Sequence, residues 1–157
     1  MKFKNMFSPI QIGPMTVKNR FVVPPMGNNF ANTDGTWSDE SVAYYAERAK
    51  GQFGLITIEA TVVHKGAKGG PRKPCLYDDN SIESLKKITD ACHAEGAKIS
   101  IQLQNAGPEG NAKNAGAPIQ AATAIAAADG RGHSGRQFLQ SRYMSLLKDM
   151  EMQRSVQ

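Results

Sequence analysis

The chain has 157 residues, of which 40% are hydrophobic and 21% are charged, and its formal net charge is +5. This length allows one domain with a core of its own, and this balance of residues excludes a disordered chain. No apolar run is long enough to span a membrane, and residues 1–7 lack the apolar stretch of a secretory signal. We therefore expect a cytoplasmic protein without a membrane partner.

Neither a metal site nor a nucleic-acid site is predicted. Cys75 and Cys92 lie far apart without a CxxC partner, and the three histidines lack metal-ligand spacing, so we expect two reduced thiols and no metal. One segment, 64–73, is basic and contains no acid: Lys65, Lys68, Arg72 and Lys73. It contains no aromatic residue, which argues against nucleic acid as a partner. Solvated charges are the expected interpretation of this segment, with an anionic ligand as the alternative.

The first part of the chain predicts a β-hairpin and then a short buried strand. Residues 9–20 alternate between apolar and polar on either side of a turn at Gly13 and Pro14. A strand over about 20–24 follows, and it must end at Pro24, which has no N–H for the ladder. It opens into Met-Gly-Asn-Asn, where Gly27 permits close approach to the backbone. In α/β proteins such a strand end is a ligand position, although an ordinary turn would have the same pattern.

The following residues alternate between helix and strand patterns. A helix is predicted over 39–50, capped by Ser38 and stopped by Gly51, with one apolar face: Val42, Tyr45, Ala46 and Ala49. Residues 55–60 predict a second buried strand that ends in a polar residue. The loop 61–78 is long and rich in glycine, as functional loops often are.

A second helix and a third strand complete the pattern. The helix is predicted over about 81–95, with Asn80 or Ser81 as its cap and an inner face of Ile82, Leu85, Ile88, Thr89 and Cys92. The strand follows over 98–103. A strand-helix-strand-helix-strand series predicts an α/β fold with a parallel sheet and right-handed crossovers. Residues 108–135 show no period, and the tail has only a loose helical stripe.

Ten short motifs stand in an order that is similar to a known family. They occupy residues 7–10, 17–20, 24–26, 34–35, 44–45, 48–49, 54–56, 59–60, 101–103 and 105–107. Together they resemble the N-terminal part of the Old Yellow Enzyme family of NADH:flavin oxidoreductases, in its enoate reductase and 2,4-dienoyl-CoA reductase-like branch. The resemblance covers about residues 5–130.

This resemblance implies the N-terminal part of a (β/α)8 TIM barrel, about three of its eight strands, preceded by a β-hairpin. It implies FMN at the carboxyl ends of the strands, held by backbone groups of the loop Pro24, Pro25, Met26 and Gly27. Ala60 would lie against the flavin, and Asn28 and Asn29 would border the substrate. Gln102 would bond the pyrimidine edge of the flavin, because an amide both donates and accepts. The alternative for Gln102 is a strand residue with a satisfied amide.

The sequence departs from the family pattern at two places. Position 27 often carries Thr or Cys in the family, and a glycine offers no side chain to tune the flavin. The family often has His-Ala-Gly-Arg after the third strand, where this chain has Asn-Ala-Gly-Pro at 105–108. Substrate or phosphate contacts from this loop are therefore not expected.

The activity implied by the resemblance is transfer of reducing equivalents from NADH or NADPH through FMN to an activated C=C bond, such as that of an enone or enoate. A whole barrel needs about 250 residues, and this chain contains none of the family's catalytic residues. We therefore expect a chain that is inactive alone and binds little FMN. The alternatives are a non-catalytic remnant and a small binding module for anionic ligands.

The expected domain division is a partial FMN-binding barrel over 1–135 and an atypical tail over 136–157. Members of the family continue with a helix similar to Ile-Ser-Thr-Glu-Glu-Ile-Tyr-Glu-Leu-Ile, which the tail does not resemble. Codons can be chosen for the tail whose shifted frame encodes Ile-Ser-Thr-Glu-Gln-Ile-Tyr-Glu-Leu-Ile. The hypothesis is therefore a frameshift near residues 132–137, which the nucleotide sequence would test.

Overall fold

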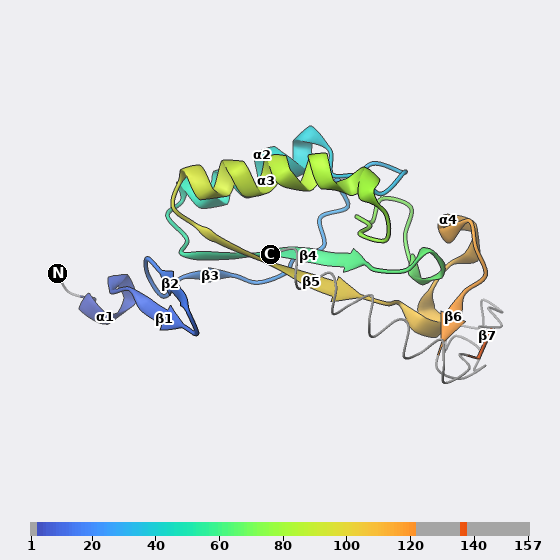
Figure 1. Ribbon diagram of the computed structural model, residues 1–157, viewed down its shortest axis with the longest axis horizontal. Helices are drawn as coiled ribbons and strands as arrows, with labels where there is room; N and C mark the ends of the chain where they lie inside the picture. The colour runs from blue at the N-terminus through green and yellow to red at the C-terminus, as the bar shows by residue number, and fades with distance from the viewer. Residues whose placement is uncertain (1–2, 122–135, 138–157) are drawn as a thin grey trace.

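The computed structural model describes residues 3–121 and 136–137. Three parallel strands form its central sheet in the order β3-β4-β5, and helices α2 and α3 cover one face of this sheet (Figure 1). The strands are β3 (Val22–Val23), β4 (Leu55–Val62) and β5 (Lys98–Gln104), and the helices are α2 (Asp39–Lys50) and α3 (Ile82–Ala94). This arrangement confirms the predicted α/β fold with a parallel sheet, in which α2 and α3 connect successive strands.

Smaller elements lie before and after this unit. A short helix, α1 (Lys4–Phe7), precedes the hairpin of β1 (Ile10–Ile12) and β2 (Met15–Val17). After β5 come α4 (Ala112–Ala115), β6 (Gln120–Ala121) and β7 (Arg136–Gln137). Three 3-10 turns connect the larger elements: η1 (Lys65–Ala67), η2 (Asp79–Ser81) and η3 (Gly107–Glu109).

The predicted hairpin is confirmed, and it lies beyond the amino ends of the sheet strands (Figure 1). β1 and β2 are antiparallel, with Ile10 opposite Val17 and Ile12 opposite Met15. Gly13 has a φ of 55°, a left-handed conformation that favours glycine in the turn. The side chain of Lys18 ties this region to the end of α3, because its Nζ donates to the Glu95 carbonyl at 2.7 Å.

The main core lies between the sheet and the two helices. Ile56 and Ile58 of β4 contact Tyr45 and Ala49 of α2 and Ile88 of α3, and all five are buried. Alternation along β4 sends these isoleucines to the helical face and Thr57 to the opposite face, where its hydroxyl bonds that of Ser100 at 2.8 Å. The apolar residues at helical spacing in the sequence, such as Tyr45, Ala49 and Ile88, are therefore residues of this core.

The predicted start and cap of α2 are confirmed, whereas Ser81 stands before α3 without a capping hydrogen bond. Ser38 accepts a hydrogen bond from the Ser41 N–H, as an N-cap should. Ser81 already has helical dihedral angles and makes no cap bond, whereas Asp78 accepts from the Asn80 N–H and starts the turn η2 that runs into α3. Ile82, predicted for the inner face of α3, is 53% exposed and is not part of that face, whereas Ile88 and Cys92 are buried.

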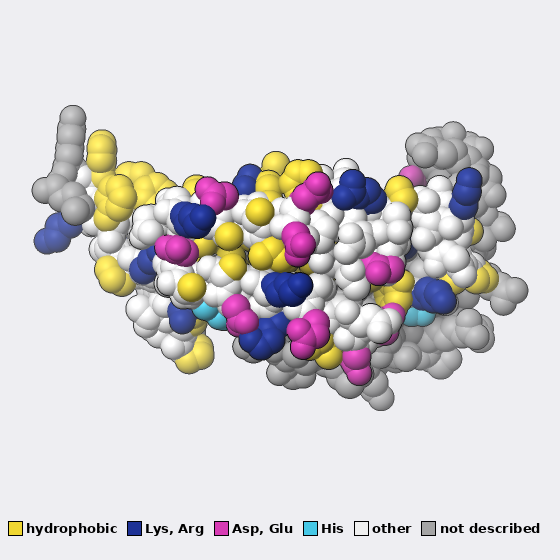
Figure 2. Space-filling view, turned by 90° about the horizontal axis from the view of Figure 1, so that it is seen from above, with side chains coloured by type: hydrophobic (Ala, Val, Ile, Leu, Met, Phe, Trp, Pro, Cys, Tyr) yellow, Lys and Arg dark blue, Asp and Glu magenta, His cyan; other side chains and the backbone are white. Residues whose placement is uncertain are grey.

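The surface over α2 and α3 carries both signs of charge. Figure 2 shows acidic and basic side chains interspersed over this face, with no gathering of one sign. Several are paired along a helix, such as Lys50 with Glu47 and Lys86 with Asp90. Such exposed pairs contribute little to stability and do not form a patch for an anionic partner.

Both cysteines are buried free thiols, as expected. Within residues 3–121 and 136–137, no group of three potential metal ligands is found, and no helix is both long and apolar enough to cross a membrane. The predicted tail, 136–157, lies outside the described residues except for Arg136–Gln137, where β7 pairs in parallel with β6. The predicted domain boundary at 135 therefore stays a prediction.

Candidate functional site

The carboxyl edge of the sheet brings the predicted cofactor residues to one place. β3 pairs with β4 through Val23 and Ile56, so Met26 and Glu59 both lie three residues beyond this pair. The Asn28 N–H donates to Glu59 Oε2 at 3.2 Å, which shows that the loop after β3 lies over the end of β4. Pro24 and Pro25 have no N–H, so the chain leaves the β3 ladder here.

A bulge in β4 places Ala60 next to Gln102. Ile58 pairs with Ile101 and Thr61 with Leu103, so two residues of β4, Glu59 and Ala60, stand opposite the single residue Gln102 of β5. Bulges redirect side chains and are frequent beside functional sites. The side chain of Gln102 is exposed and makes no hydrogen bond among the described residues. The alternative, an amide satisfied by another group of the strand layer, finds no partner among the described residues and stays open, because the exposed amide can also bond to water.

Glu59 is the charged centre of this edge. Its side chain is fully buried, and Lys73 Nζ lies 3.9 Å from its Oε2. Its other oxygen, Oε1, is buried and has no hydrogen-bond partner among the described residues. Burial raises the pKa of Glu59, while the N–H groups of Asn28 and Asn29 and the Lys73 charge oppose this rise.

Tyr45 links this edge to helix α2. The Glu59 N–H donates to the Tyr45 hydroxyl at 2.9 Å, and the tyrosine is 1% exposed. Burial raises the pKa of Tyr45 well above its usual range, so the hydroxyl stays neutral. The backbone of the bulge is therefore held from the helical side while the Glu59 side chain holds the loop after β3.

Asn28 and Asn29 are placed differently from each other. Asn28 is half-buried, its Oδ1 accepts from the Phe30 N–H at 2.9 Å, and its Nδ2 is buried without a partner. Asn29 is exposed and has a φ of 58°, in the left-handed region that few non-glycine residues adopt. Neither side chain is used by the sheet or the helices, so both stay candidates for substrate contacts.

Lys65 and Arg72 of the basic segment 64–73 are exposed, as solvated charges should be, but Lys68 is not. Lys68 is 3% exposed, and its Nζ donates to the Thr33 carbonyl at 2.8 Å. Arg72 donates to the Ala31 carbonyl at 3.0 Å and to the Phe30 carbonyl at 3.2 Å. The segment can do this because it folds back, with Cys75 bridged to Val62 next to the end of β4. Lys68 and Arg72 therefore stabilise the loop after β3 through its backbone carbonyls.

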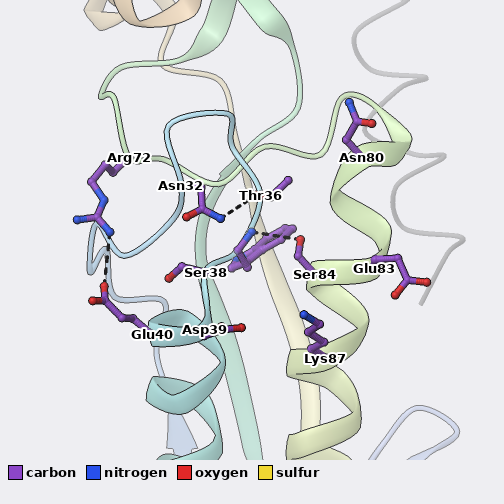
Figure 3. A pocket seen from close by; sticks show the side chains of 11 residues that line it. Asn32, Thr36, Ser38, Asp39, Glu40, Arg72, Asn80, Glu83, Ser84 and Lys87 are labelled. Carbon is purple, nitrogen blue, oxygen red and sulfur yellow. Dashed lines mark hydrogen bonds and ion pairs between the residues drawn. The ribbon is translucent and has the colours of Figure 1, made fainter.

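A separate polar cavity of about 610 Å³ lies between the N-terminal ends of α2 and α3 (Figure 3). Its lining mixes charges of both signs: Arg72 and Lys87 with Asp39, Glu40 and Glu83. The Trp37 N–H donates to Ser84 Oγ at 3.2 Å, and Arg72 Nη2 lies 3.5 Å from Glu40 Oε2. None of Met26, Ala60 and Gln102 lines this cavity, so it is distinct from the edge of the sheet.

The neighbouring thiols and phenol are not reactive groups. Burial raises the pKa of Cys75, and it raises that of Cys92 to about 11. Tyr77, beside Cys75, has a pKa raised to about 12, again chiefly through burial. Because a thiol reacts as its thiolate, neither cysteine is a nucleophile at neutral pH.

The family model of the NADH:flavin oxidoreductase / NADH oxidase family matches residues 5–156, nearly the whole chain. The chain belongs to this family. Members use FMN together with a reduced nicotinamide cofactor. The sheet is accordingly the N-terminal part of a (β/α)8 barrel, and its carboxyl edge is where such barrels place their active sites.

Relatives of known function agree with this assignment. The chain is 39% identical to an NADH oxidase of Thermoanaerobacter brockii over 106 residues, which are 67% of this chain and 16% of that protein. It is 37% identical to a cinnamate reductase of Clostridium sporogenes over 107 residues, 65% of this chain and 16% of that protein. The chain therefore spans about a sixth of the length of these relatives.

Solved structures share the fold of the described part. An Old Yellow Enzyme from Pichia sp. AKU4542 has a TM-score of 0.82 and 30% identity, covering 92% of this chain and 40% of that chain. A 2-naphthoyl-CoA reductase has a TM-score of 0.86 and 28% identity, covering 94% of this chain and 24% of that chain. The chain thus shares its fold with a part of each of these longer enzymes.

The residues at the edge fit a flat, polar cofactor. Gly27 has no side chain and Ala60 has a small one, so a ring could approach the backbone closely. The Gln102 amide is exposed, has no bond among the described residues, and offers both a donor and an acceptor. The Met26 side chain is 55% exposed on the loop above them.

Sequence reasoning missed three residues of this site: Glu59, Lys73 and Tyr45. For Glu59 a signal was present, because an acid stands inside an otherwise uncharged buried strand over 55–62. Such a residue is rarely buried without a cation and hydrogen bonds. Nothing local in the sequence pairs it with Lys73, which lies fourteen positions further along the chain.

Proposed function

We propose that this chain supplies part of the flavin platform of an FMN-dependent oxidoreductase of the cytoplasm that uses NADH or NADPH to reduce an activated C=C bond. One observation supports the proposal: the β4 bulge puts Glu59 and Ala60 opposite Gln102, and the Asn28 N–H joins the loop after β3 to Glu59 of the same bulge. When bound, FMN supplies the hydride transfer. The substrate class is an enone or enoate, in keeping with the cinnamate reductase among the relatives.

The chain's own residues have defined roles in this proposal. Pro24, Pro25, Met26 and Gly27 present backbone groups to the ring, and Ala60 leaves room for it. Gln102 donates to and accepts from its pyrimidine edge. Asn28 and Asn29 stand next to this loop and would border the substrate. No general acid for reducing a C=C bond is found among the described residues of this edge, so the chain alone is proposed to be inactive.

Fluorescence titration of FMN tests the platform. We expect weak, non-stoichiometric quenching by the chain, because one layer of a barrel covers only part of the ring. Gln102→Ala should weaken it at least several-fold, since about 1 kcal/mol per lost hydrogen bond corresponds to about a fivefold change. Gln11→Ala, an exposed glutamine on the distant hairpin, is the matched control and should leave the binding unchanged.

Two results would count against the proposal. Equal quenching by the chain and by Gln102→Ala would remove Gln102 from the platform. Tight, stoichiometric binding of FMN would contradict the expectation that the chain alone holds little FMN. The rival function, a module for anionic ligands in residues 64–73, is not favoured, because Lys68 and Arg72 are engaged with backbone carbonyls.

A further inference from the structure

Lys73 occupies the space of a side chain that the loop after β3 does not have. A Cβ built on Gly27 would lie 3.0 Å from Lys73 Nζ and 3.8 Å from Glu59 Oε2. The lysine side chain is 24% exposed and the glutamate side chain is fully buried. A cation and an anion from the strand β4 and the loop after it therefore meet directly against Gly27.

The buried carboxylate in turn holds the backbone of the same loop. Glu59 Oε2 accepts from the Asn28 N–H at 3.2 Å, and the Asn29 N–H also acts on this carboxylate. Asn29 has its left-handed φ of 58° immediately after this contact. A conformation of this kind persists only where its surroundings determine it, and the carboxylate is the partner that the structure provides.

We propose that Glu59 and Lys73 are positioning residues, whose opposite charges lock the loop Gly27–Asn29 in the shape of the cofactor platform. The inference rests on the proposed function for its purpose, but the lock itself is a property of the chain without any cofactor. Hydrogen bonds to an ionised acceptor are stronger than those to a neutral one, so the lock depends on the charge of Glu59. Lys73 keeps that charge in place.

The lock should respond to pH in a defined direction. Among the described residues, the charged or titratable groups that act on Glu59 are Lys73 from the following loop and Tyr45 from α2. Burial raises the pKa of Glu59, and Lys73 opposes this rise, so Lys73→Met should raise the pKa further. The N–H bonds of Asn28 and Asn29 weaken as the pH falls through this pKa.

The protonation of Glu59 changes the order of the loop and the free energy of unfolding in opposite directions, so the two effects can be told apart by experiment. The folded-state pKa of Glu59 lies above its ordinary value, so its contribution to folding is fully present at acid pH and is lost as the pH rises through the raised pKa. Loop order therefore increases with pH while this contribution to stability decreases. A glutamate that contributed only to the stability of the whole fold would not make the order of the loop Gly27–Asn29 increase with pH.

Hydrogen exchange measured by NMR, on the full chain without FMN, tests the lock at Asn28 and Asn29. Protection of both amides should fall at least about tenfold as the pH drops through the Glu59 titration, and Lys73→Met should move the midpoint up by about one pH unit. Lys73→Arg should restore the midpoint, and Glu59→Gln should abolish the pH dependence. The Phe21 amide, bonded to the neutral Asn19 Oδ1 at 3.0 Å, is the internal control.

A second pair of variants guards against a misfolded mutant. Gly27→Ala places a methyl group against Lys73 Nζ and should lower the protection of Asn28, whereas it should cost much less in the Lys73→Met background. Protection that is independent of pH in the chain, or a midpoint that Lys73→Met leaves unchanged, would overturn the inference. If exchange behaves as expected but FMN binds equally to Gln102→Ala, the proposed function fails and the lock stands.

Discussion

The two edges of the sheet are built differently. At the amino edge, polar groups are paired: Lys18 and Asn19 donate to the carbonyls of Glu95 and Gln52, and the Lys98 N–H donates to the Gly54 carbonyl at 2.8 Å. At the carboxyl edge, Asn28 Nδ2 and Glu59 Oε1 are buried without partners among the described residues, and the Gln102 amide is free. Groups of the chain itself satisfy the polar atoms named at the amino edge, whereas the polar atoms named at the carboxyl edge are available to a ligand or to water.

This difference agrees with the general division of labour in (β/α)8 barrels. Stability is concentrated at the amino ends of the strands, and function at the carboxyl ends. Unpaired polar groups and left-handed residues cost free energy, and they are tolerated where a ligand or mechanism uses them. Substitutions at the amino edge should therefore cost more stability than matched substitutions at the carboxyl edge.

The largest effect is expected at Gly54. A Cβ there would lie 2.7 Å from Val17 Cγ1 and 2.8 Å from the Asn19 carbonyl oxygen, and the glycine is buried. Gly54→Ala should lower the free energy of unfolding by about 3 kcal/mol, because the backbone carbonyl of Asn19 cannot move away from the added methyl group. Urea unfolding followed by circular dichroism measures this. Gly69→Ala, whose Cβ would meet nothing closer than 3.6 Å, is the control, and an equal cost for both would contradict the comparison.

A smaller effect is expected where α2 holds the β4 bulge. Tyr45→Phe removes the hydroxyl that accepts the buried Glu59 N–H, so it should cost about 2 kcal/mol in the same unfolding experiment. Tyr44→Phe is the neighbouring control, because its hydroxyl makes no hydrogen bond among the described residues. That change should stay within about 0.5 kcal/mol. Similar costs for the two tyrosines would show that the bulge does not depend on this bond.

The smallest effect is expected in a comparison of two asparagines whose side chains accept from the N–H two residues further on. Asn19 accepts from the Phe21 N–H and Asn28 from the Phe30 N–H, but only the Asn19 amide also donates, to the Gln52 carbonyl at 2.7 Å. Asn19→Ala should therefore cost about 1 kcal/mol more than Asn28→Ala. Thermal unfolding of both variants measures the difference. The reverse order would mean that the carboxyl edge is the better satisfied of the two.

The periodic parts of the fold could be predicted from the sequence. Apolar residues at helical spacing identified α2, and buried runs between glycines and prolines identified β4 and β5, because burial on one face dictates residue type. β4 is nevertheless two residues longer than predicted, since Thr61 and Val62 pair with Leu103 and Gln104. The range of α3 was predicted to within one residue, but its capping hydrogen bond was not, because a 3-10 turn precedes the helix and Asp78 accepts from the Asn80 N–H there.

The site could be predicted only in part. The strand ends located Met26, Ala60 and Gln102 at one edge, since the carboxyl ends of parallel strands coincide. The Lys73–Glu59 pair could not be predicted, because it depends on how residues 63–75 return to Val62. The same return explains why Lys68 looked solvated: the sequence shows its charge but not the Thr33 carbonyl that receives it.

The most direct test of the platform is a map of where FMN contacts the labelled chain, obtained from NMR shift changes at increasing FMN concentration. The account predicts changes at the Met26 methyl group and at the amides of Gly27, Ala60 and Gln102, with Lys87 in the separate cavity unaffected. Changes centred on that cavity, or none at the carboxyl edge at saturating FMN, would contradict it.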